Sequence, residues 1–189
     1  MRIVLALCCL VVVYAQVPCE SPKQWEGRRI FYDRTQNFRE LAKISYDEIY
    51  QRVRIVEEIE IGQDKDYYDV LYLHSIGKEY RYNFKTRQCN VTQITRPFRP
   101  AGVPPDAEFR GSATLGAFGV PGEYIVIENF AGQRGDEFYF GIVTSPDCFP
   151  VQDNFYSNST GLFTASYFDV TLGVTDPNVF IPPRECFML

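Results

Sequence analysis

Residue patterns that indicate a nucleophile with its general base are scarce in this 189-residue chain. His74 is the only histidine, and no GxSxG motif lies near it, so a nucleophile–His–acid triad is not indicated. The string GSATLG at 111–116 lacks the lysine of a phosphate-binding loop. Carboxylates are numerous enough for a glycosidase-like pair, but the sequence singles out no two of them. We therefore expect no catalytic residues and predict that the protein is not an enzyme.

Six carboxylates gather between residues 57 and 69, and carboxylate oxygens are the ligands that calcium prefers. The string DKDYYD at 64–69 nevertheless lacks the glycine and the terminal glutamate of an EF-hand loop. We expect a solvated strand edge with a hairpin turn, no dedicated metal site, no required cofactor and weak calcium binding at most. The six acidic residues are Glu57, Glu58, Glu60, Asp64, Asp66 and Asp69.

The six cysteines divide into two groups. Cys8 and Cys9 lie in MRIVLALCCLVVVYA at 1–15, where a basic residue, an apolar run and a closing alanine predict a secretory signal peptide. A membrane-spanning helix needs about 20 apolar residues, and this run is shorter, so we expect no transmembrane segment. The other four cysteines predict two disulfides in an oxidising compartment, with three connectivities open: Cys19, Cys89, Cys148 and Cys186.

Two N-glycosylation sequons fit the same compartment. They begin at Asn90 and Asn158, and neither has proline in the middle position. We expect a secreted, extracellular glycoprotein, with lysosomal delivery as an alternative destination. The formal net charge of −5 argues against binding to nucleic acid, which requires clustered basic residues.

Apolar and polar residues alternate with period two along most of the chain, which is typical of strands with one buried face. In QRVRIVEEIEI, for example, Val53 and Ile55 share one face while Arg52 and Arg54 share the other. Both faces of EFYFGIV at 137–143 are apolar, which favours a central strand. The predicted strands cover 24–33, 39–47, 51–61, 67–75, 78–84, 89–95, 124–130, 137–143 and 162–174.

Helical periodicity is weak, so the predicted fold class is all-β. We expect two stacked antiparallel sheets, as a sandwich or a half-open barrel, in a single domain at 16–189. The segment 96–111, which holds four prolines, is predicted to be a long loop between two halves of this domain. Trp25, at the start of the first strand, is expected to lie in the core.

Several ordered strings resemble the ependymin family, especially its ependymin-related members. They are PCESPKQWEGR at 18–28, SYDEIYQRVRI at 45–55, TRQCNVT at 86–92, DCFPVQDNF at 147–155 and YFDVTLGVTDPNVFIPPREC at 167–186. The resemblance implies packed antiparallel sheets around an apolar cavity, similar to bacterial lipoprotein carriers. It also implies a secreted or lysosomal glycoprotein, a homodimer, and the pairs Cys19–Cys148 and Cys89–Cys186. Calcium binding and cell–matrix adhesion go with the family, and lipid binding goes with the related subgroup.

Small residues interrupt the apolar strands at Gly141, Ala165, Ser166 and Gly173, where a packed core would hold larger side chains. Tyrosines recur near them, and a tyrosine combines an apolar body with a hydroxyl. With the cavity that the family implies, these features predict a pocket for an apolar, lipid-like molecule. The alternative is a matrix adhesion protein without a dedicated pocket. Candidate pocket residues are Tyr82, Tyr124, Phe138, Phe140, Ile142, Phe168 and Val170.

Overall fold

The computed structural model describes residues 18–159 and 161–187, so the predicted signal peptide at 1–15 lies outside the described residues. This part of the chain is dominated by eleven strands: β1 (Gln24–Asp33), β2 (Phe38–Asp47), β3 (Arg52–Ile61), β4 (Asp64–Leu73), β5 (Lys78–Asn83), β6 (Gln88–Gln93), β7 (Glu108–Gly116), β8 (Tyr124–Arg134), β9 (Glu137–Thr144), β10 (Pro150–Ser157) and β11 (Gly161–Leu172).

Three short 3₁₀ helices complete the secondary structure of the described residues: η1 (His74–Ile76), η2 (Pro177–Phe180) and η3 (Arg184–Phe187). Within the ranges 18–159 and 161–187, none of the helices is long and apolar enough to cross a membrane.

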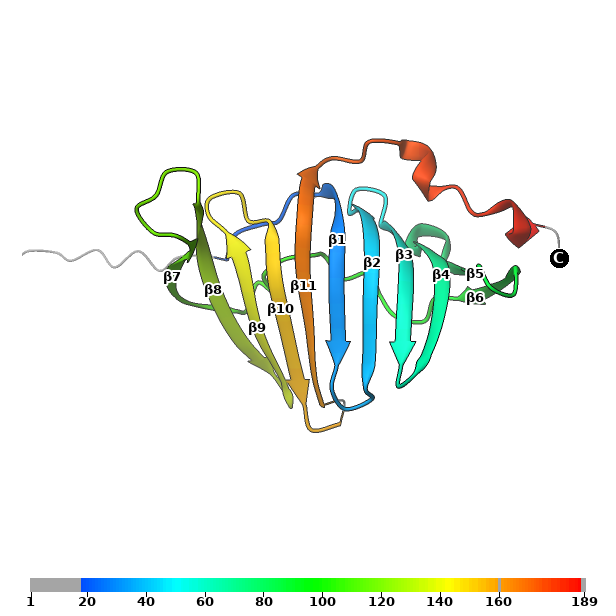
Figure 1. The fold of residues 1–189 in the computed structure, drawn as a ribbon, viewed down its shortest axis with the longest axis horizontal. Coiled ribbons are helices and arrows are strands. Elements are labelled where there is room, and N and C mark those ends of the chain that lie inside the picture. Colours follow the sequence, from blue (N-terminus) through cyan, green and yellow to red (C-terminus); the bar gives the residue numbers. More distant parts are fainter. Residues whose placement is uncertain (1–17, 160, 188–189) are drawn as a thin grey trace, which may run out of the picture.

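All eleven strands belong to one antiparallel sheet in the order β6-β5-β4-β3-β2-β1-β11-β10-β9-β8-β7. Strands β1 to β6 form one meander and β7 to β11 form a second, and the two meanders join where β1 pairs with β11. The sheet is curved, and its two ends turn away from the viewer in Figure 1. The predicted all-β, antiparallel, half-open form is confirmed. Every strand is hydrogen-bonded to its neighbours, from edge strand β6 to the opposite edge strand β7.

The proline-rich segment at 94–107, which we call the strap, links β6 to β7 across one face of this sheet (Figure 1). The long loop was therefore predicted correctly, although it ends earlier than expected because β7 begins at Glu108. Strands β7 and β10 were missed. Strand β7 has no buried residue, and burial does not alternate along β10, where polar residues such as Asp153 and Asn154 lie.

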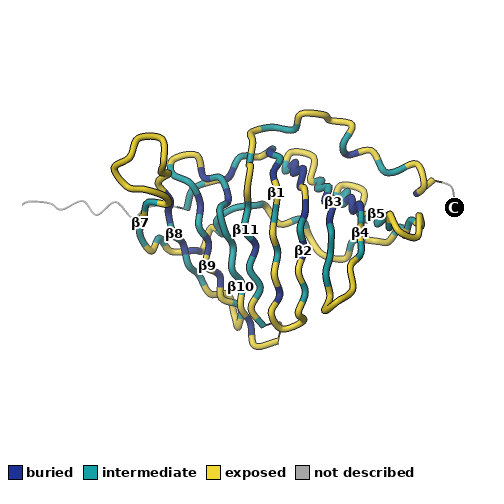
Figure 2. The backbone as a smooth tube through the Cα atoms, viewed as in Figure 1, coloured by how far each residue is buried: buried dark blue, intermediate teal, exposed yellow. Residues whose placement is uncertain are grey.

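The sheet has an inner face, on which the strap packs, and an outer face opposite to it. Trp25, Ile44 and Tyr46 form a buried inner-face cluster that Phe98 and Ala101 of the strap cover. Buried residues accordingly gather at the start of β1 and along the C-terminal half of β2 (Figure 2). A second inner-face cluster near the other end of the sheet consists of Ala107, Phe130, Tyr139, Val143 and Cys148.

On the outer face, the C-terminal segment covers the start of β3 and strands β4 to β6. Leu71 and Tyr80 of the sheet pack against Phe180 and Cys186 of this segment. Arg54 strengthens the contact, because its Nη1 donates to the carbonyl of Val179 at 2.5 Å while its Nε donates to Asp69 at 2.7 Å. The outer face of the remaining strands carries no such cover within the described part of the chain.

Both predicted disulfides are present. Cys19–Cys148 lies on the inner-face side, where the start of the described chain meets the β9–β10 loop. Cys89–Cys186 joins edge strand β6 to η3 on the outer face. Each disulfide therefore fixes one terminal segment of the described chain onto a different face of the sheet.

Candidate ligand-binding site

The inner face and the strap border a cavity of about 510 Å³. Side chains of the sheet form its floor, the strap forms its roof, and residues 132–134 and 137 of the β8–β9 hairpin lie at one end. The lining is largely aromatic and aliphatic, with a few charged groups. The floor consists of Trp25, Arg29, Ile44, Tyr46, Val53, Tyr139, Asp153, Phe155 and Tyr167.

Aromatic contacts hold the centre of this floor. The Trp25 ring stacks on Tyr46 with 5.2 Å between centroids and meets the edge of Tyr167 at 5.9 Å. Tyr46 in turn stacks on Phe98 of the strap at 5.9 Å. Trp25 is 2 % exposed, which confirms its predicted place in the core.

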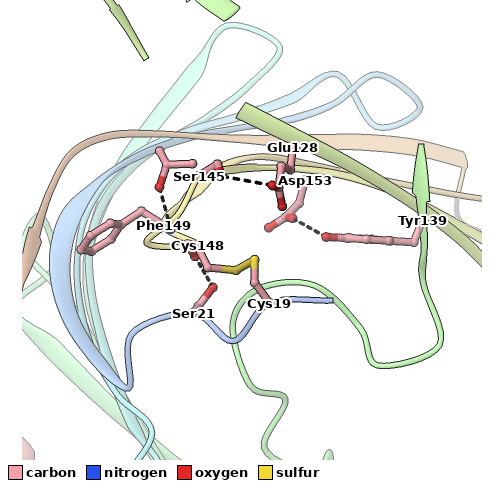
Figure 3. Close-up of a disulfide and its surroundings, with 9 residues drawn as sticks. Cys19, Ser21, Glu128, Tyr139, Ser145, Cys148, Phe149 and Asp153 are labelled. Atoms are coloured by element: carbon pink, nitrogen blue, oxygen red, sulfur yellow. Dashed lines mark hydrogen bonds between the residues drawn. A yellow bond between two sulfur atoms is a disulfide. The ribbon is translucent and has the colours of Figure 1, made fainter. Parts of the chain in front are cut away.

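The strap is fixed at several points. The Ala101 N–H donates to the Tyr46 hydroxyl at 2.9 Å, and Gly102 forms an isolated β-bridge with Glu20. Gly102 has a φ of 104°, and a Cβ there would collide with the side chain of Ser21. The Ser21 hydroxyl donates to the Cys148 carbonyl at 2.7 Å, next to the disulfide (Figure 3). The roof of the cavity is thus tied to the sheet through the N-terminal segment.

One wall of the cavity carries a carboxyl group between two phenols. The Tyr139 hydroxyl donates to Asp153 at 3.2 Å, and Tyr139 points toward Asp153 in Figure 3. Burial raises the pKa of Asp153 to about 6, although hydrogen bonds from Tyr167 and Tyr139 act to lower it. Burial and the nearby carboxylate raise the pKa of Tyr139, so this side chain remains a phenol at neutral pH.

A row of charged groups continues from Arg29 beyond the cavity along the inner face. Arg29 donates to Glu40 through Nε at 2.9 Å and Nη2 at 2.6 Å, and Arg81 donates to Glu57 at 3.0 Å. Burial, followed by the neighbouring Glu40, raises the pKa of Glu57 to about 7. Because each cation has a carboxylate partner, this row neutralises itself within the sheet.

The predicted pocket residues are divided between the two faces. Val170 lies on the inner face and packs against the Trp25 cluster. Phe138 and Phe140 instead line a hollow of about 590 Å³ on the outer face, together with Asn154, Tyr156 and Leu162. Tyr139, which lies between Phe138 and Phe140, reaches the inner cavity, as does Glu137 at the start of β9.

Ile142 and Phe168 also lie on the outer face, away from the inner cavity. A bulge in β11, with Asp169 at a φ of 51°, breaks the alternation between Phe168 and Val170 and so brings Val170 to the inner face. Tyr82 packs in the outer-face cluster beside Cys89, and Tyr124 is 41 % exposed at the start of β8. These placements correct the sequence-based assignment of the cavity wall.

The small residue Gly141 serves a different purpose from the one expected. A Cβ on Gly141 would collide with the hydroxyl of Tyr139, so the glycine makes room for the tyrosine ring rather than for a ligand. The residues missed by sequence reasoning are Arg29, Tyr46 and the strap. The four prolines of the strap were a signal, but they did not reveal on which face the segment lies.

The remaining predicted sites lie at the surface. Asn90 on β6 and Asn158 after β10 are both exposed, so either sequon is accessible for glycosylation, which stays a prediction. The acidic residues of 57–69 are distributed over both faces, and within the described residues all of them except Asp64 have a polar partner. Lys65 lies 2.8 Å from Glu58 and also contacts Glu60, while Asp66 accepts from Asn83 at 3.0 Å.

Comparison of the sequence with known proteins assigns the chain to a family. The family model for ependymin matches residues 62–186, more than half of the chain. The chain belongs to the ependymin family. It is 32 % identical over 173 residues to mammalian ependymin-related protein 1 of Rattus norvegicus, covering 89 % of this chain and 76 % of the relative. It is 25 % identical over 171 residues to ependymin-2 of Carassius auratus, covering 89 % and 79 % respectively.

Family membership and the two disulfides identify an extracellular protein of the ependymin type. A solved structure of an uncharacterized conserved protein from Thermus thermophilus has a similar fold. The TM-score is 0.56 at 12 % identity, covering 87 % of this chain and 88 % of that one. At this identity the similarity concerns the fold alone.

Proposed function

We propose that this ependymin-family protein is a secreted glycoprotein that binds an apolar, lipid-like ligand between the inner face of its sheet and the strap. The observation that carries the proposal is the inner cavity of about 510 Å³. Its volume falls within the roughly 300–1,000 Å³ of small-molecule pockets. Its lining combines aromatic and aliphatic side chains with a few fixed polar groups, which suits an apolar molecule with one polar end.

Burial supplies the affinity in this proposal. Apolar surface gains about 25 cal/mol per Å² when it leaves water, before the costs of association are subtracted. The stacked rings of Trp25 and Tyr46 in the floor and of Phe98 in the strap preorganise the site, so little side-chain ordering is needed when a ligand enters.

The test is displacement of a fluorescent fatty acid from delipidated, folded protein by natural lipids. Ala101→Phe places a ring in the roof of the cavity and is expected to weaken binding roughly tenfold or more, since overpacking costs about 1–3 kcal/mol. Phe140→Glu is the matched control, because Phe140 lies on the outer face, and it should leave the affinity unchanged. If only Phe140→Glu protein loses binding, the ligand binds in the outer hollow and not in the inner cavity. A delipidated protein that binds no fatty acid, phospholipid or glycolipid would end the carrier proposal.

The alternative is a calcium-associated adhesion protein of the extracellular matrix, and the acidic β3–β4 hairpin favours it. Calcium would have to displace Lys65 from Glu58 and Glu60, which argues for weak binding. Calorimetry on deglycosylated protein should find no submicromolar calcium site. Tight binding that is lost in Glu58→Gln/Glu60→Gln protein would favour adhesion over ligand transport.

A further inference from the structure

One donor in the cavity floor has no partner in the protein. The indole Nε1–H of Trp25 is buried, and it is the only buried side-chain nitrogen or oxygen in ranges 18–159 and 161–187 without a hydrogen-bond partner. Trp25 itself is 2 % exposed and lines the cavity. Buried donors in folded proteins are nearly always hydrogen-bonded, so this exception requires an explanation.

The polar neighbours of Trp25 are satisfied among themselves. The Tyr46 hydroxyl accepts from Ala101 at 2.9 Å and donates to Glu48 at 3.1 Å. Arg29 is engaged twice by Glu40, and Tyr139 donates to Asp153. None of these groups turns an acceptor toward the indole. An acceptor for the indole therefore comes from outside this cluster, either from solvent or from a molecule that enters the cavity.

We propose that the Trp25 Nε1–H is the hydrogen-bond donor that anchors the polar end of the ligand. The inference rests on the proposed function and narrows it to apolar molecules that carry an acceptor oxygen. A pure hydrocarbon would fill the cavity but leave the indole unsatisfied, whereas an acceptor at this point removes the cost of the buried donor.

The charges around Trp25 favour an uncharged acceptor. Arg29 already donates twice to Glu40 Oε1, so the floor next to the indole offers no spare cation for a carboxylate, and Arg99, which has no carboxylate partner among the described residues, lies in the strap instead. Asp153, on the adjoining wall, would repel a second negative charge brought near it in a poorly hydrated site. The ligand class is therefore an ester, amide or alcohol of a long-chain apolar molecule, in preference to a free fatty acid bound with its carboxylate at the indole.

The chain contains a single tryptophan, so ¹H–¹⁵N spectra of the full protein hold one indole resonance that reports on this atom alone. Titration with 1-monooleoylglycerol should move the indole proton downfield, as a new hydrogen bond requires. The methyl resonances of Ile44 and Val53, which line the same cavity, should saturate at the same ligand concentration. Oleate at pH 8 should shift the methyl groups with a smaller effect on the indole.

Methyl shifts without any downfield indole shift would overturn this inference and leave the proposed function standing, since the indole would then be satisfied by solvent. No shift in either set would refute both proposals. Equal indole shifts with oleate would overturn the preference for an uncharged acceptor. As a second measurement, Trp25→Phe should lower the affinity for 1-monooleoylglycerol about tenfold and that for oleate clearly less. An equal loss for both ligands would assign Trp25 a packing role only.

Discussion

The inner and outer faces of the sheet are built from the same strands, yet they differ in what lies over them. The inner face holds half-buried charged groups such as Arg29 and Asp153 beneath a strap. The outer face leaves aromatic residues in the open, with Phe138, Phe140 and Phe168 between 41 % and 46 % exposed. The covering segment, and not the polarity of the strand, therefore determines which face becomes an interior.

Removing each disulfide in turn is expected to give the largest effects and compares the contributions of the two faces to stability and ligand binding. Cys19–Cys148 closes 129 residues and Cys89–Cys186 closes 97 residues. In the chain-entropy model a loop of about 100 residues contributes about 4.7 kcal/mol, so each double Cys→Ala variant should lose several kcal/mol of unfolding free energy.

Only the loss of Cys19–Cys148 should also weaken ligand binding, because this disulfide lies beside the segment that holds the strap. Urea unfolding and probe displacement on both variants provide the comparison. Both variants are compared at a urea concentration at which they are folded. If Cys89→Ala/Cys186→Ala protein loses ligand binding as strongly as the variant without Cys19–Cys148, the two disulfides do not differ in their effect on the cavity.

Arg29 tests the buried charges of the inner face. Arg29→Leu leaves Glu40, whose side chain is 7 % exposed, without its partner and should cost about 3–5 kcal/mol. The double variant Arg29→Leu/Glu40→Leu should recover most of this loss, since a buried pair replaced by apolar residues is often neutral. Chemical denaturation measures both. A single variant as stable as the wild type would mean that Glu40 is hydrated.

A pH effect of intermediate size is expected from Asp153. Its folded-state pKa of about 6 lies above the ordinary value of 3.8, so the folded protein binds more protons between these two pH values. The unfolding free energy should therefore fall by about 1–3 kcal/mol as the pH rises from about 4 to about 7.

Asp153→Asn should flatten this slope, whereas Asp136→Asn, in the exposed β8–β9 turn, should not change it. Glu57, with a pKa of about 7, acts in the same direction and should keep part of the slope in the variant. Thermal unfolding across this pH range measures the effect. A stability that rises with pH in the same window would show that Asp153 is ionised and well solvated when folded.

The smallest change in stability is expected on the outer face. Phe140→Ser and Phe168→Ser should each change the unfolding free energy by about 0.5 kcal/mol or less, because both side chains are exposed. We predict that this apolar surface is buried in a homodimer, so the double variant should shift sedimentation toward the monomer. If the wild-type protein sediments as a monomer at micromolar concentration, the prediction of a homodimer is wrong.

Sequence alone predicted the strands well and the cavity wall poorly, for one physical reason. Period-two alternation shows that a strand has two different faces, but in EFYFGIV both faces are aromatic or aliphatic. Nothing local distinguishes Tyr139, which faces inward, from Phe138 and Phe140, which face outward. The bulge at Asp169 was equally hidden, although it decides the face of Val170. The disulfide pairs were predicted through the family resemblance, because spacing left three connectivities open.

The central claim is that the inner cavity, and not the outer hollow, holds the ligand. Photo-crosslinking with a diazirine-bearing monoacylglycerol, followed by residue-level mass spectrometry, tests it most directly. The account predicts adducts on the strap at 99–107 and on Ile44 and Tyr46, and their loss when unlabelled lipid is added in excess. Competable adducts on Phe140, Tyr156 and Leu162 instead would contradict it.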